Sequence, residues 1–474
     1  MALQLYDTLT REERLFVPRN DGKVGMYVCG PTVQAASHIG HGRAAVVFDV
    51  LRRYLTFSGY DVTFVQNITD IDDKIIFRAN AEKVSAAQIA TRYTRVWNDT
   101  MRRLNVLPAT VQPHATGHLV EMFTLIGELI DAGYAYEVDG DVFFRVRKFA
   151  TYGALSRRIV DDMQQGDDVV DAERKEDQLD FALWKSAKPG EPFWTSPFGE
   201  GRPGWHIECS AMAAKHLPDG IDIHGGGFDL VFPHHENEIA QHEAAHGGTF
   251  ANYWVHNGMV RMGAEKMSKS LGNVVALDEA LDQWGAGPLR VWYLSAQHRT
   301  PLTFDDDRLG DAAVVFNRFV TCVRSTARLG EVETDDTVVA PYRQRFVQAM
   351  DDDVNVPVAM AVLHELVTDA NAALKSANSQ NPDALTKAAS LGGLLRTLCD
   401  DVFGLGVADT LRDETKAEEL IKPFVDDLLN QRREARNAKD WATADQLRDL
   451  LQNAGVVVED SVDGERWYVS KDRP

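Results

Sequence analysis

The chain has 474 residues, too many for one hydrophobic core, so its length predicts two to four domains. Its 44% hydrophobic and 26% charged residues are ordinary for a globular protein, and no apolar run reaches the length of a membrane span, so we expect a cytoplasmic protein. A formal charge of −21 argues against a broad nucleic-acid-binding surface, and four cysteines without a CxxC pair argue against a disulfide framework.

Two strand–helix–strand patterns predict the central fold. Residues 24–30 (VGMYVCG) read as a buried strand, and an apolar-periodic helix follows and ends at Ser58-Gly59 before a second strand, DVTFV. A similar unit spans residues 221–260, with strand IDIHGGG, a histidine-rich helix and strand YWVHNGMV. Such units imply a parallel sheet that binds its ligand at the carboxyl ends of the strands.

The segment between these two units differs in character. It contains an amphipathic helix (residues 118–134), a strand (140–146) and a Gly/Pro-rich return (188–205). This composition indicates a domain inserted into a split nucleotide-binding fold.

The rest of the chain is predicted to be mainly helical from Gly310 to Leu405. A long helix that ends near Gly455 follows, and the last element is a hairpin turned at Asp463-Gly464.

The tetrapeptide His38-Ile39-Gly40-His41 stands where the first strand ends and the first helix begins. A helix N-terminus presents free N–H groups and a positive dipole end, which suits phosphate. Gly40 does not block a close ligand, and two imidazoles can donate to phosphate oxygens. Taken alone, the pair could equally be loop histidines without a role.

The sequence Lys266-Met267-Ser268-Lys269-Ser270 lies in a glycine-flanked loop after the last predicted strand of the second unit. Two lysines three positions apart form a cationic clamp that can close on developing phosphate charge. A solvated surface turn is the ordinary alternative for a lysine pair.

The stretch FPHHENEIAQHEAAH, residues 232–246, contains four histidines and three glutamates. Two pairs in it compete as a metal site. The HExxH pattern of His242 and His246 is that of zinc proteases, whereas His234 and Glu238 have the same i, i+4 spacing.

The glycines after the HExxH pattern disfavour the protease alternative. Gly247-Gly248 ends the helix immediately, where a protease would continue towards a third ligand. We interpret His235, His242 and His246 as exposed or packed helix residues.

Together, the two phosphate-binding motifs form the HIGH and KMSKS signature of class I aminoacyl-tRNA synthetases. The segments MYVCGPTV, NITDIDDKI, GRPGWHIECSAM, FPHHENE and EKMSKSLGN further resemble the cysteinyl-tRNA synthetase family. The resemblance runs from Leu5 to the C-terminal hairpin. It implies an α/β fold, with a split Rossmann-type parallel-sheet catalytic domain, an inserted connective domain, a helical bundle and a small mixed α/β C-terminal domain.

The resemblance also implies a function for each region. Residues 1–110 and 201–250 are the two halves of the catalytic domain, 111–200 the inserted connective domain, 251–310 a stem-contact region with the KMSKS loop, 311–410 a tRNA-binding helical bundle, and 411–474 an anticodon-recognition domain.

One zinc ion per chain is implied, held by Cys29, Cys209, His234 and Glu238. Two thiolates, an imidazole and a carboxylate can form a zinc site, and segments that end at one sheet edge can converge on it. Zinc favours a thiolate ligand over a hydroxyl, so it would select cysteine against serine where size alone discriminates weakly.

Further residues are assigned to substrates by the resemblance. Thr69 and Trp205 match positions that line the amino-acid pocket, although Trp205 could be a core aromatic. Positions matching ATP contacts are Gly40, Gly227, Asp229 and Lys269. A tight strand-to-helix turn explains the glycines of residues 225–227 almost as well.

Two groups of charged residues remain open. The carboxylates Asp70, Asp72 and Asp73 are interpreted as caps of the following helix. The positions that match anticodon contacts are Arg436, Asp445 and Asp460, and these could equally be surface charges.

The implied reaction is ATP-dependent ligation of L-cysteine to tRNA(Cys) through a cysteinyl adenylate, with Mg²⁺ on the ATP phosphates. The catalytic residues would be His38 and His41 on one side of the phosphates and Lys266 and Lys269 on the other. We expect a monomer and no membrane partner.

Three alternatives are weaker. A cysteine ligase of the mycothiol pathway resembles only the part of the chain before the C-terminal region, so residues 414–467 favour the synthetase. A catalytically silent nucleotide-binding module does not need intact motifs, and the metalloprotease lacks a third ligand.

Overall fold

A four-stranded parallel sheet forms the centre of the molecule in the computed structural model, which describes residues 2–162, 174–262, 265–266, 275–378, 380–461 and 464–469. Its strands are, in spatial order, β11 (Ala251–Asn257), β10 (Ile221–Gly227), β3 (Lys23–Val28) and β4 (Asp61–Gln66). Both predicted strand–helix–strand units are therefore present, and the predicted α/β class is confirmed.

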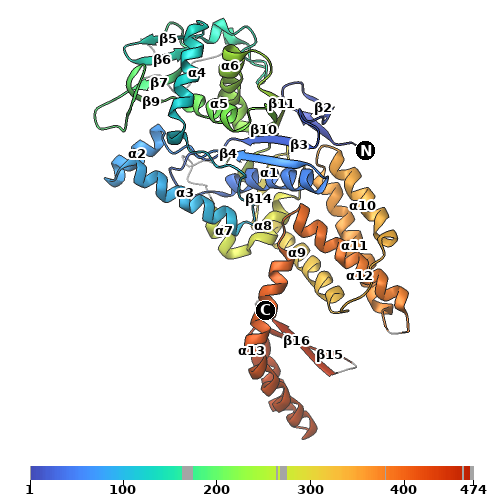
Figure 1. The fold of residues 1–474 in the computed structure, drawn as a ribbon. Helices are drawn as coiled ribbons and strands as arrows, with labels where there is room; N and C mark the ends of the chain where they lie inside the picture. The colour runs from blue at the N-terminus through green and yellow to red at the C-terminus, as the bar shows by residue number, and fades with distance from the viewer. Residues whose placement is uncertain are drawn as a thin grey trace.

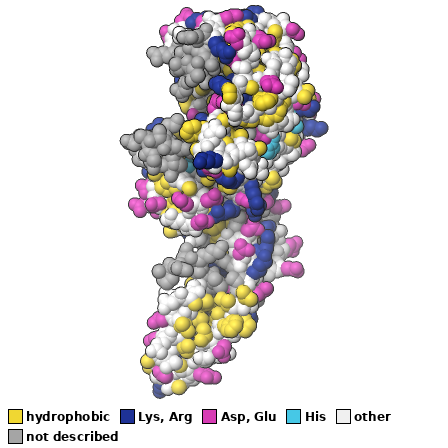
Figure 2. Space-filling view, turned by 90° about the vertical axis from the view of Figure 1, so that its left-hand side faces the viewer, with side chains coloured by type: hydrophobic (Ala, Val, Ile, Leu, Met, Phe, Trp, Pro, Cys, Tyr) yellow, Lys and Arg dark blue, Asp and Glu magenta, His cyan; other side chains and the backbone are white. Residues whose placement is uncertain are grey.

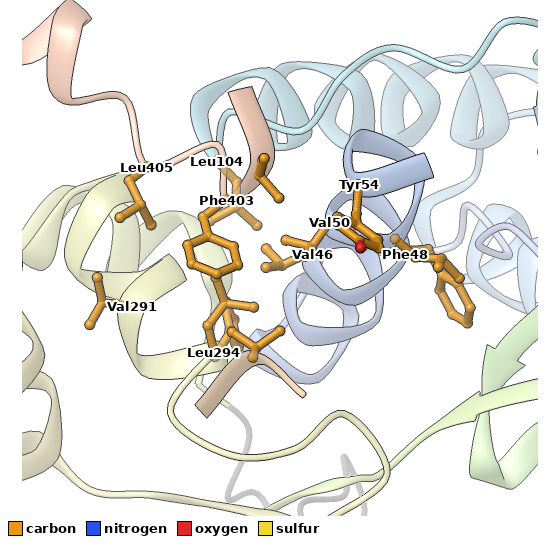
Figure 3. Packing of buried hydrophobic residues seen from close by; sticks show 14 of the residues in the cluster. Val46, Phe48, Val50, Tyr54, Leu104, Val291, Leu294, Phe403 and Leu405 are labelled. Atoms are coloured by element: carbon orange, nitrogen blue, oxygen red, sulfur yellow. The ribbon is translucent and has the colours of Figure 1, made fainter. Parts of the chain in front are cut away.

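Helix α1 (Ile39–Phe57) joins β3 to β4 and ends, as predicted, at Ser58-Gly59, where Gly59 has φ 95°. Its apolar side chains reach beyond the sheet. Figure 3 shows Val46 and Val50 of this helix beside Phe403, and all three belong to one buried cluster. The helix is thus shared between the catalytic sheet and the helical part of the chain.

The insertion forms a separate layer above the sheet (Figure 1). Its five-stranded antiparallel sheet has the order β5–β6–β7–β9–β8. The elements are α4 (Leu119–Asp131), β5 (Ala135–Val138), β6 (Asp141–Phe144), β7 (Phe181–Ser186), β8 (Trp194–Ser196) and β9 (Gly199–Pro203). After it, α5 (Trp205–His216) leads back to β10, and η5 (Phe228–Leu230), η6 (Val231–His235) and α6 (Glu236–His246) lead on to β11.

The strand predicted to run on to Val260 is interrupted. β11 ends at Asn257, and β12 (Val260–Met262) begins a second small sheet with β13 (Glu265–Lys266) and β14 (Leu302–Phe304). The break lies at Gly258, where a Cβ would stand 2.5 Å from the carbonyl oxygen of Arg299. Helices α7 (Leu277–Trp284) and α8 (Ala286–Tyr293) lie between β13 and β14.

The helical region begins slightly before the predicted point, at Asp306. It consists of α9 (Asp306–Ala327), α10 (Asp336–Asp351), α11 (Val356–Ser376), α12 (Pro382–Thr397) and the turn η8 (Leu398–Val402). The remaining elements are β1 (Gln4–Asp7), β2 (Glu12–Leu15), α2 (Asp73–Glu82), α3 (Ala86–Arg103), and the short turns η1 (Ala115–Gly117), η2 (Val146–Lys148) and η3 (Val160–Asp162).

The prediction of one long helix that ends near Gly455 is wrong. The chain forms two helices, α13 (Val407–Asn437) and α14 (Trp441–Asn453), before the strands β15 (Val456–Ser461) and β16 (Gly464–Val469). Lys439 has φ 62°, which no α-helix accommodates, and the Asp440 side chain accepts from the Thr443 amide to start α14.

This C-terminal region extends away from the rest of the molecule in Figure 1 and has its own small core of Val425, Leu429, Leu451 and Val456. Figure 2 shows hydrophobic side chains gathered over it, while acidic and basic side chains are mixed on the rest of that face. No helix in the described ranges has the length and apolar character needed to cross a membrane.

Candidate active site

The four predicted metal ligands come from separate parts of the chain and meet at the carboxyl edge of the parallel sheet. Cys29 directly follows β3, Cys209 lies in α5, His234 in η6 and Glu238 in α6. One ligand atom from each lies within 4.8 Å of all the others. Cys209, His234 and Glu238 are almost fully buried, and Cys29 is partly exposed.

The distances in this group suit a tetrahedral metal. The two sulfur atoms are 3.8 Å apart, and Glu238 Oε1 lies 3.3 Å from the Cys29 sulfur and 2.9 Å from His234 Nε2. Bonds of about 2.0–2.3 Å to one zinc ion place tetrahedral ligand atoms roughly 3.3–3.8 Å apart. The donor set of two thiols, one imidazole and one carboxylate therefore fits zinc in its chemistry, and the two contacts of Cys29 also fit it in size, whereas the 2.9 Å between Glu238 and His234 is a hydrogen-bond distance.

The charges of the group are strongly coupled. Burial by itself would raise the pKa of Glu238, but His224 and His234 outweigh it and hold this pKa well below its usual range. A hydrogen bond from the Cys29 thiol lowers the pKa of Cys209 to about 6. A carboxylate and a thiolate are thus favoured inside the protein, which is the state that a cation requires.

A second set of ligand atoms, from Cys29, His224, His235 and Glu238, also converges. We favour the first set because it contains two sulfur ligands, which zinc binds strongly. Glu238 also directs its two oxygens differently, since Oε1 faces Cys29 and His234 while Oε2 lies 3.2 Å from His224 Nε2. If Glu238 binds a metal through Oε1, His224 would hold its other oxygen.

The residues around this group hold its ligands in place. The Trp205 ring stacks on the His234 ring with centroids 4.4 Å apart, and His206 Nδ1 lies 2.9 Å from His234 Nδ1. Because Trp205 is only half-buried and faces a proposed ligand, it is not a core aromatic. A wall of the site is thus formed by the first turn of α5.

Thr69 lies in a buried hydrogen-bond chain next to the same site. Its hydroxyl donates to Glu208 Oε2 at 3.0 Å and accepts from Asn67 Nδ2 at 3.2 Å. Asn67 Oδ1 in turn accepts from the Gly30 amide and lies 3.7 Å from the Cys209 sulfur. Thr69 therefore connects the end of β4 to α5.

The two histidines of the HIGH motif shape the start of α1. His38 is the N-cap residue, and its Nδ1 accepts from the Gly40 amide, while His41 Nδ1 accepts from the His38 amide. The two rings stack with centroids 3.7 Å apart. Because Nδ1 is an acceptor in each neutral ring, Nε2 carries the proton and is a donor.

The KMSKS motif lies only partly within the described chain. Lys266 belongs to β13, whose backbone pairs with β12, and Lys269 lies outside the described residues. The chain returns beside the HIGH motif, since the Ile39 amide donates to Val275 O and the Leu277 amide donates to Ser37 O. The two motifs are therefore neighbours through their flanking backbone.

Comparisons with known proteins match almost the whole chain. The family of class I (C) tRNA synthetase catalytic domains matches residues 15–314, the DALR domain residues 345–408, and the cysteinyl-tRNA ligase anticodon-binding domain residues 420–468. The cysteine–tRNA ligase of Desulfitobacterium hafniense is 45% identical over 98% of this chain and 99% of that protein.

The chain belongs to the cysteinyl-tRNA synthetase family. Its activity is that of a cysteine–tRNA ligase. The corresponding ligase of Caldicellulosiruptor saccharolyticus is 46% identical over 98% of both chains. The match at residues 420–468 also favours a synthetase over an aminosugar ligase, because it covers an anticodon-binding domain.

The fold agrees with this family. A methionyl-tRNA synthetase of Mycobacterium tuberculosis in complex with methionyl-adenylate superposes with a TM-score of 0.61, at 16% identity, over 82% of this chain and 93% of that one. At this low identity the likeness shows a common class I synthetase fold.

Packing accounts for most of the glycines at the end of β10. A Cβ at Gly225 would lie 2.3 Å from Phe48, and one at Gly226 would lie 2.8 Å from the His235 ring. At Gly227 the one atom closer than 3 Å is Asp229 Oδ1, at 2.4 Å. Gly227 and the exposed Asp229 thus remain the members of this turn that can face a ligand.

The three carboxylates after β4 all have structural partners. Asp72 caps α2 by accepting from the Lys74 amide, as predicted. Asp70 instead accepts from the amide and hydroxyl of Thr116, and Asp73 pairs with Lys185 and Arg202 of the insertion. Two of them therefore connect the catalytic sheet to neighbouring segments.

The HExxH pattern does not form a metal site among the described residues. His242 and His246 lie on α6 with ring centroids 4.7 Å apart, but neither belongs to a converging group of three ligands. His246 Nε2 lies 3.0 Å from Glu128, and Glu243 accepts from the Phe250 amide. Gly247 ends the helix with φ 69°, as predicted.

The three predicted anticodon residues all lie in the C-terminal region. Arg436 is exposed near the end of α13, Asp445 is exposed on α14, and Asp460 belongs to β15.

The sequence interpretation missed several buried histidines around the metal ligands. His224 and His256 are buried near the group and His206 is partly buried beside His234, while His235, interpreted as a helix residue, is fully buried with Nδ1 2.8 Å from His256 Nε2. His256 Nδ1 in turn lies within hydrogen-bond distance of the Thr8 hydroxyl, at 2.8 Å. A signal existed, since a histidine interrupts each of the apolar strands IDIHGGG and YWVHN.

Proposed function

We propose that the chain activates L-cysteine with ATP as cysteinyl adenylate and then transfers the cysteinyl group to the terminal ribose of tRNA(Cys). The observation that carries this proposal is the convergence of Cys29, Cys209, His234 and Glu238 at the carboxyl edge of the parallel sheet. In sheets of this type, ligands bind at that edge.

We assign these four residues as the ligands of one zinc ion. When bound, zinc supplies a soft Lewis acid that favours the thiolate of cysteine over the hydroxyl of serine. The Trp205 ring against His234 limits the space beside the ligands, and Thr69 orders Glu208 next to Cys209. These side chains orient the amino acid so that its carboxylate can approach ATP.

The phosphates of ATP, with Mg²⁺, would lie at the start of α1. There, the Nε2–H groups of His38 and His41 can donate to phosphate oxygens, and the positive dipole end of the helix favours the phosphate charge. Lys266 and Lys269 would stabilise the developing phosphate charge, and Gly40, Gly227 and Asp229 would contact the nucleotide. The carboxylate of cysteine attacks the α-phosphorus and pyrophosphate leaves, so the protein contributes positioning and charge stabilisation.

The later step needs the tRNA. Residues 111–200 would support its acceptor end, 251–310 would contact its stem, and 311–410 would bind it as a helical bundle. Residues 411–474 would read its anticodon, with contacts from Arg436, Asp445 and Asp460. The 2′ hydroxyl of the terminal ribose would receive the acyl group. We expect the chain to act as a monomer.

Cysteine-dependent exchange of labelled pyrophosphate into ATP, measured together with bound zinc and tRNA charging, tests the proposal. We expect exchange with cysteine and none with serine, one zinc per chain, and charging of tRNA(Cys). Exchange that persists after complete removal of zinc, with unchanged selectivity against serine, would contradict the assigned role of the metal. Charging without any amino-acid-dependent exchange would contradict the adenylate pathway.

A further inference from the structure

Arg43, two residues after the HIGH motif, is completely buried in α1. Its guanidinium donates to the carbonyl oxygens of Met259 and His298, both at 3.4 Å, and of Thr300. Among the described residues, no carboxylate lies within ion-pair distance of Arg43, and burial lowers its pKa to about 10. A buried cation without an ion-pair partner is costly, so these carbonyl contacts must compensate for its desolvation.

The carbonyls that accept from Arg43 belong to the base of the β12–β14 pair. Met259 O also accepts from the Leu302 amide at 2.9 Å, and His298 O accepts from the Gly258 amide at 2.9 Å. β12 then pairs with β13, where Arg261 lies opposite Lys266. The guanidinium therefore holds the strands that lead to Lys266.

The first turn of α1 is fixed from the other side as well. Tyr293 of α8 donates to Ile39 O at 2.7 Å, and a Cβ at Gly42 would lie 2.5 Å from the same hydroxyl. The Leu277 amide, after the KMSKS segment, donates to Ser37 O at 2.9 Å. The chain before residue 263 and the chain after residue 274 are thus both hydrogen-bonded to residues 37–43, and Arg43 makes the bond to the preceding chain, at Met259.

We infer that Arg43 is a positioning residue for the ATP-dependent step, which holds the strand pair carrying Lys266 at a fixed place relative to His38 and His41. This inference rests on the proposed adenylate mechanism. Arginine suits the task because its planar fork can reach several carbonyl oxygens at once, whereas lysine has a single nitrogen. A displacement of about 1 Å between two halves of a phosphate site can cost a hundredfold in rate.

The inference separates ATP-dependent effects from effects on cysteine. Arg43 contacts none of Cys29, Cys209, His234 or Glu238. Its replacement should therefore leave zinc content and the KM for cysteine unchanged, while it lowers kcat and raises the KM for ATP. If Arg43 only stabilised the fold, the molecules that remain folded would keep both the kcat and the KM for ATP of the wild-type protein.

The test compares Arg43→Gln and Arg43→Lys in pyrophosphate exchange by the full-length, zinc-loaded protein. For Arg43→Gln we expect kcat/KM for ATP to fall on the order of a hundredfold and KM for cysteine to change less than about threefold. Arg43→Lys, which keeps the charge and one contact, should recover part of the loss. If the glutamine variant does not fold, the lysine variant alone must still show the selective loss for ATP.

Arg290→Lys is the matched control. Arg290 is equally buried and donates to the carbonyl oxygens of Phe403 and Leu104, but it has Asp49 as a partner, and none of its hydrogen bonds to described residues reaches β12 or β14. We expect it to lower Tm while its exchange kinetics stay within about threefold of wild type.

Two results would overturn the inference: Arg43 variants with the same KM for ATP and the same kcat as the control, or equal losses for ATP and cysteine. A wild-type protein without cysteine-dependent exchange would instead overturn the adenylate proposal itself.

Discussion

Glu238 Oε1 lies 2.9 Å from His234 Nε2, and both side chains are almost completely shielded from solvent. The same oxygen lies 3.3 Å from the sulfur of Cys29. An isolated carboxylate would not remain charged at such a depth, so its neighbours decide its state. The ligand group therefore acts as a unit in which each member depends on the others.

Replacement of one sulfur should remove the metal and leave the fold. We expect Cys209→Ser to weaken zinc binding by at least about a hundredfold, because a serine hydroxyl is a poor zinc ligand at neutral pH. Cysteine-dependent exchange should fall with it, whereas the circular dichroism spectrum should be unchanged. Zinc content by atomic absorption is the measurement.

The control for this variant is Cys322→Ser, which alters a cysteine buried in α9 that belongs to neither converging ligand group. It should keep one zinc per chain. Equal zinc content in both variants would refute the assignment of Cys209.

Zinc binding should release protons, because two of the proposed ligands hold a proton in the metal-free site. Burial raises the pKa of Cys29 well above its usual value. For His234, burial lowers the pKa, but the charges and hydrogen bonds of Glu238 and Cys209 together outweigh it and raise the pKa to about 10. Cys209, with a pKa of about 6, is mostly thiolate at pH 7. The metal-free site thus carries one proton on Cys29 and one on His234 that zinc must displace, so zinc binding should release about two protons.

It follows that zinc affinity rises with pH, roughly a hundredfold per unit near pH 7, and weakens as pH falls. Calorimetric titration in two buffers of different ionisation enthalpy measures the protons released. A value near zero would mean that Cys29 and His234 are not ligands, or that both are already deprotonated.

The catalytic strands could be predicted from the sequence because their apolar runs have sharp ends. IDIHGGG coincides with β10, and Ser58-Gly59 stops α1. The break of the last helix at Lys439 could not be predicted, since its apolar spacing continues on both sides of a single residue with positive φ.

The histidine-rich stretch shows what local spacing cannot settle. Both of its i, i+4 pairs are compatible with a metal, and the choice depends on what each pair faces after folding. His234 and Glu238 face Cys29 and Cys209 from distant parts of the chain, whereas His242 packs against Phe250 and His246 lies against Glu128. The extended backbone of Phe232, with φ −141° and ψ 133°, separates His234 from the preceding turn and helps aim it inward.

A buried charge network connects the catalytic helix with the helical region, and its loss should be costly. Asp49 Oδ2 accepts from Arg290 at 2.6 Å and from Arg53 at 2.8 Å. Asp49→Asn leaves the buried guanidinium of Arg290 and the partly buried one of Arg53 without their carboxylate, so we expect a loss of about 3–5 kcal/mol in the free energy of unfolding. Denaturant titration followed by tryptophan fluorescence measures it.

The exposed pair of Asp99 and Arg102 provides the comparison. Asp99→Asn should leave the unfolding midpoint nearly unchanged, because exposed ion pairs contribute little. A similar small change for Asp49→Asn would show that the buried network is not needed to neutralise Arg290.

The C-terminal region should be needed for tRNA and not for cysteine activation. Its core of Val425, Leu429, Leu451 and Val456 is separate from the main cluster, whereas Leu411 still packs on the main cluster. A protein shortened after Arg412 should therefore fold and keep cysteine-dependent exchange within about threefold. Its kcat/KM for tRNA(Cys) should fall by at least about a hundredfold, since base-specific contacts contribute about 1–3 kcal/mol each.

A tRNA(Cys) transcript with a changed anticodon makes this test specific. The full-length protein should charge it far more slowly than the unaltered transcript, while the shortened protein should charge both at the same low rate. If the shortened protein still distinguished the two transcripts, the anticodon would be read by residues before 413, and Arg436, Asp445 and Asp460 would lose their assigned role. If it lost exchange as well, the two cores would depend on each other for folding.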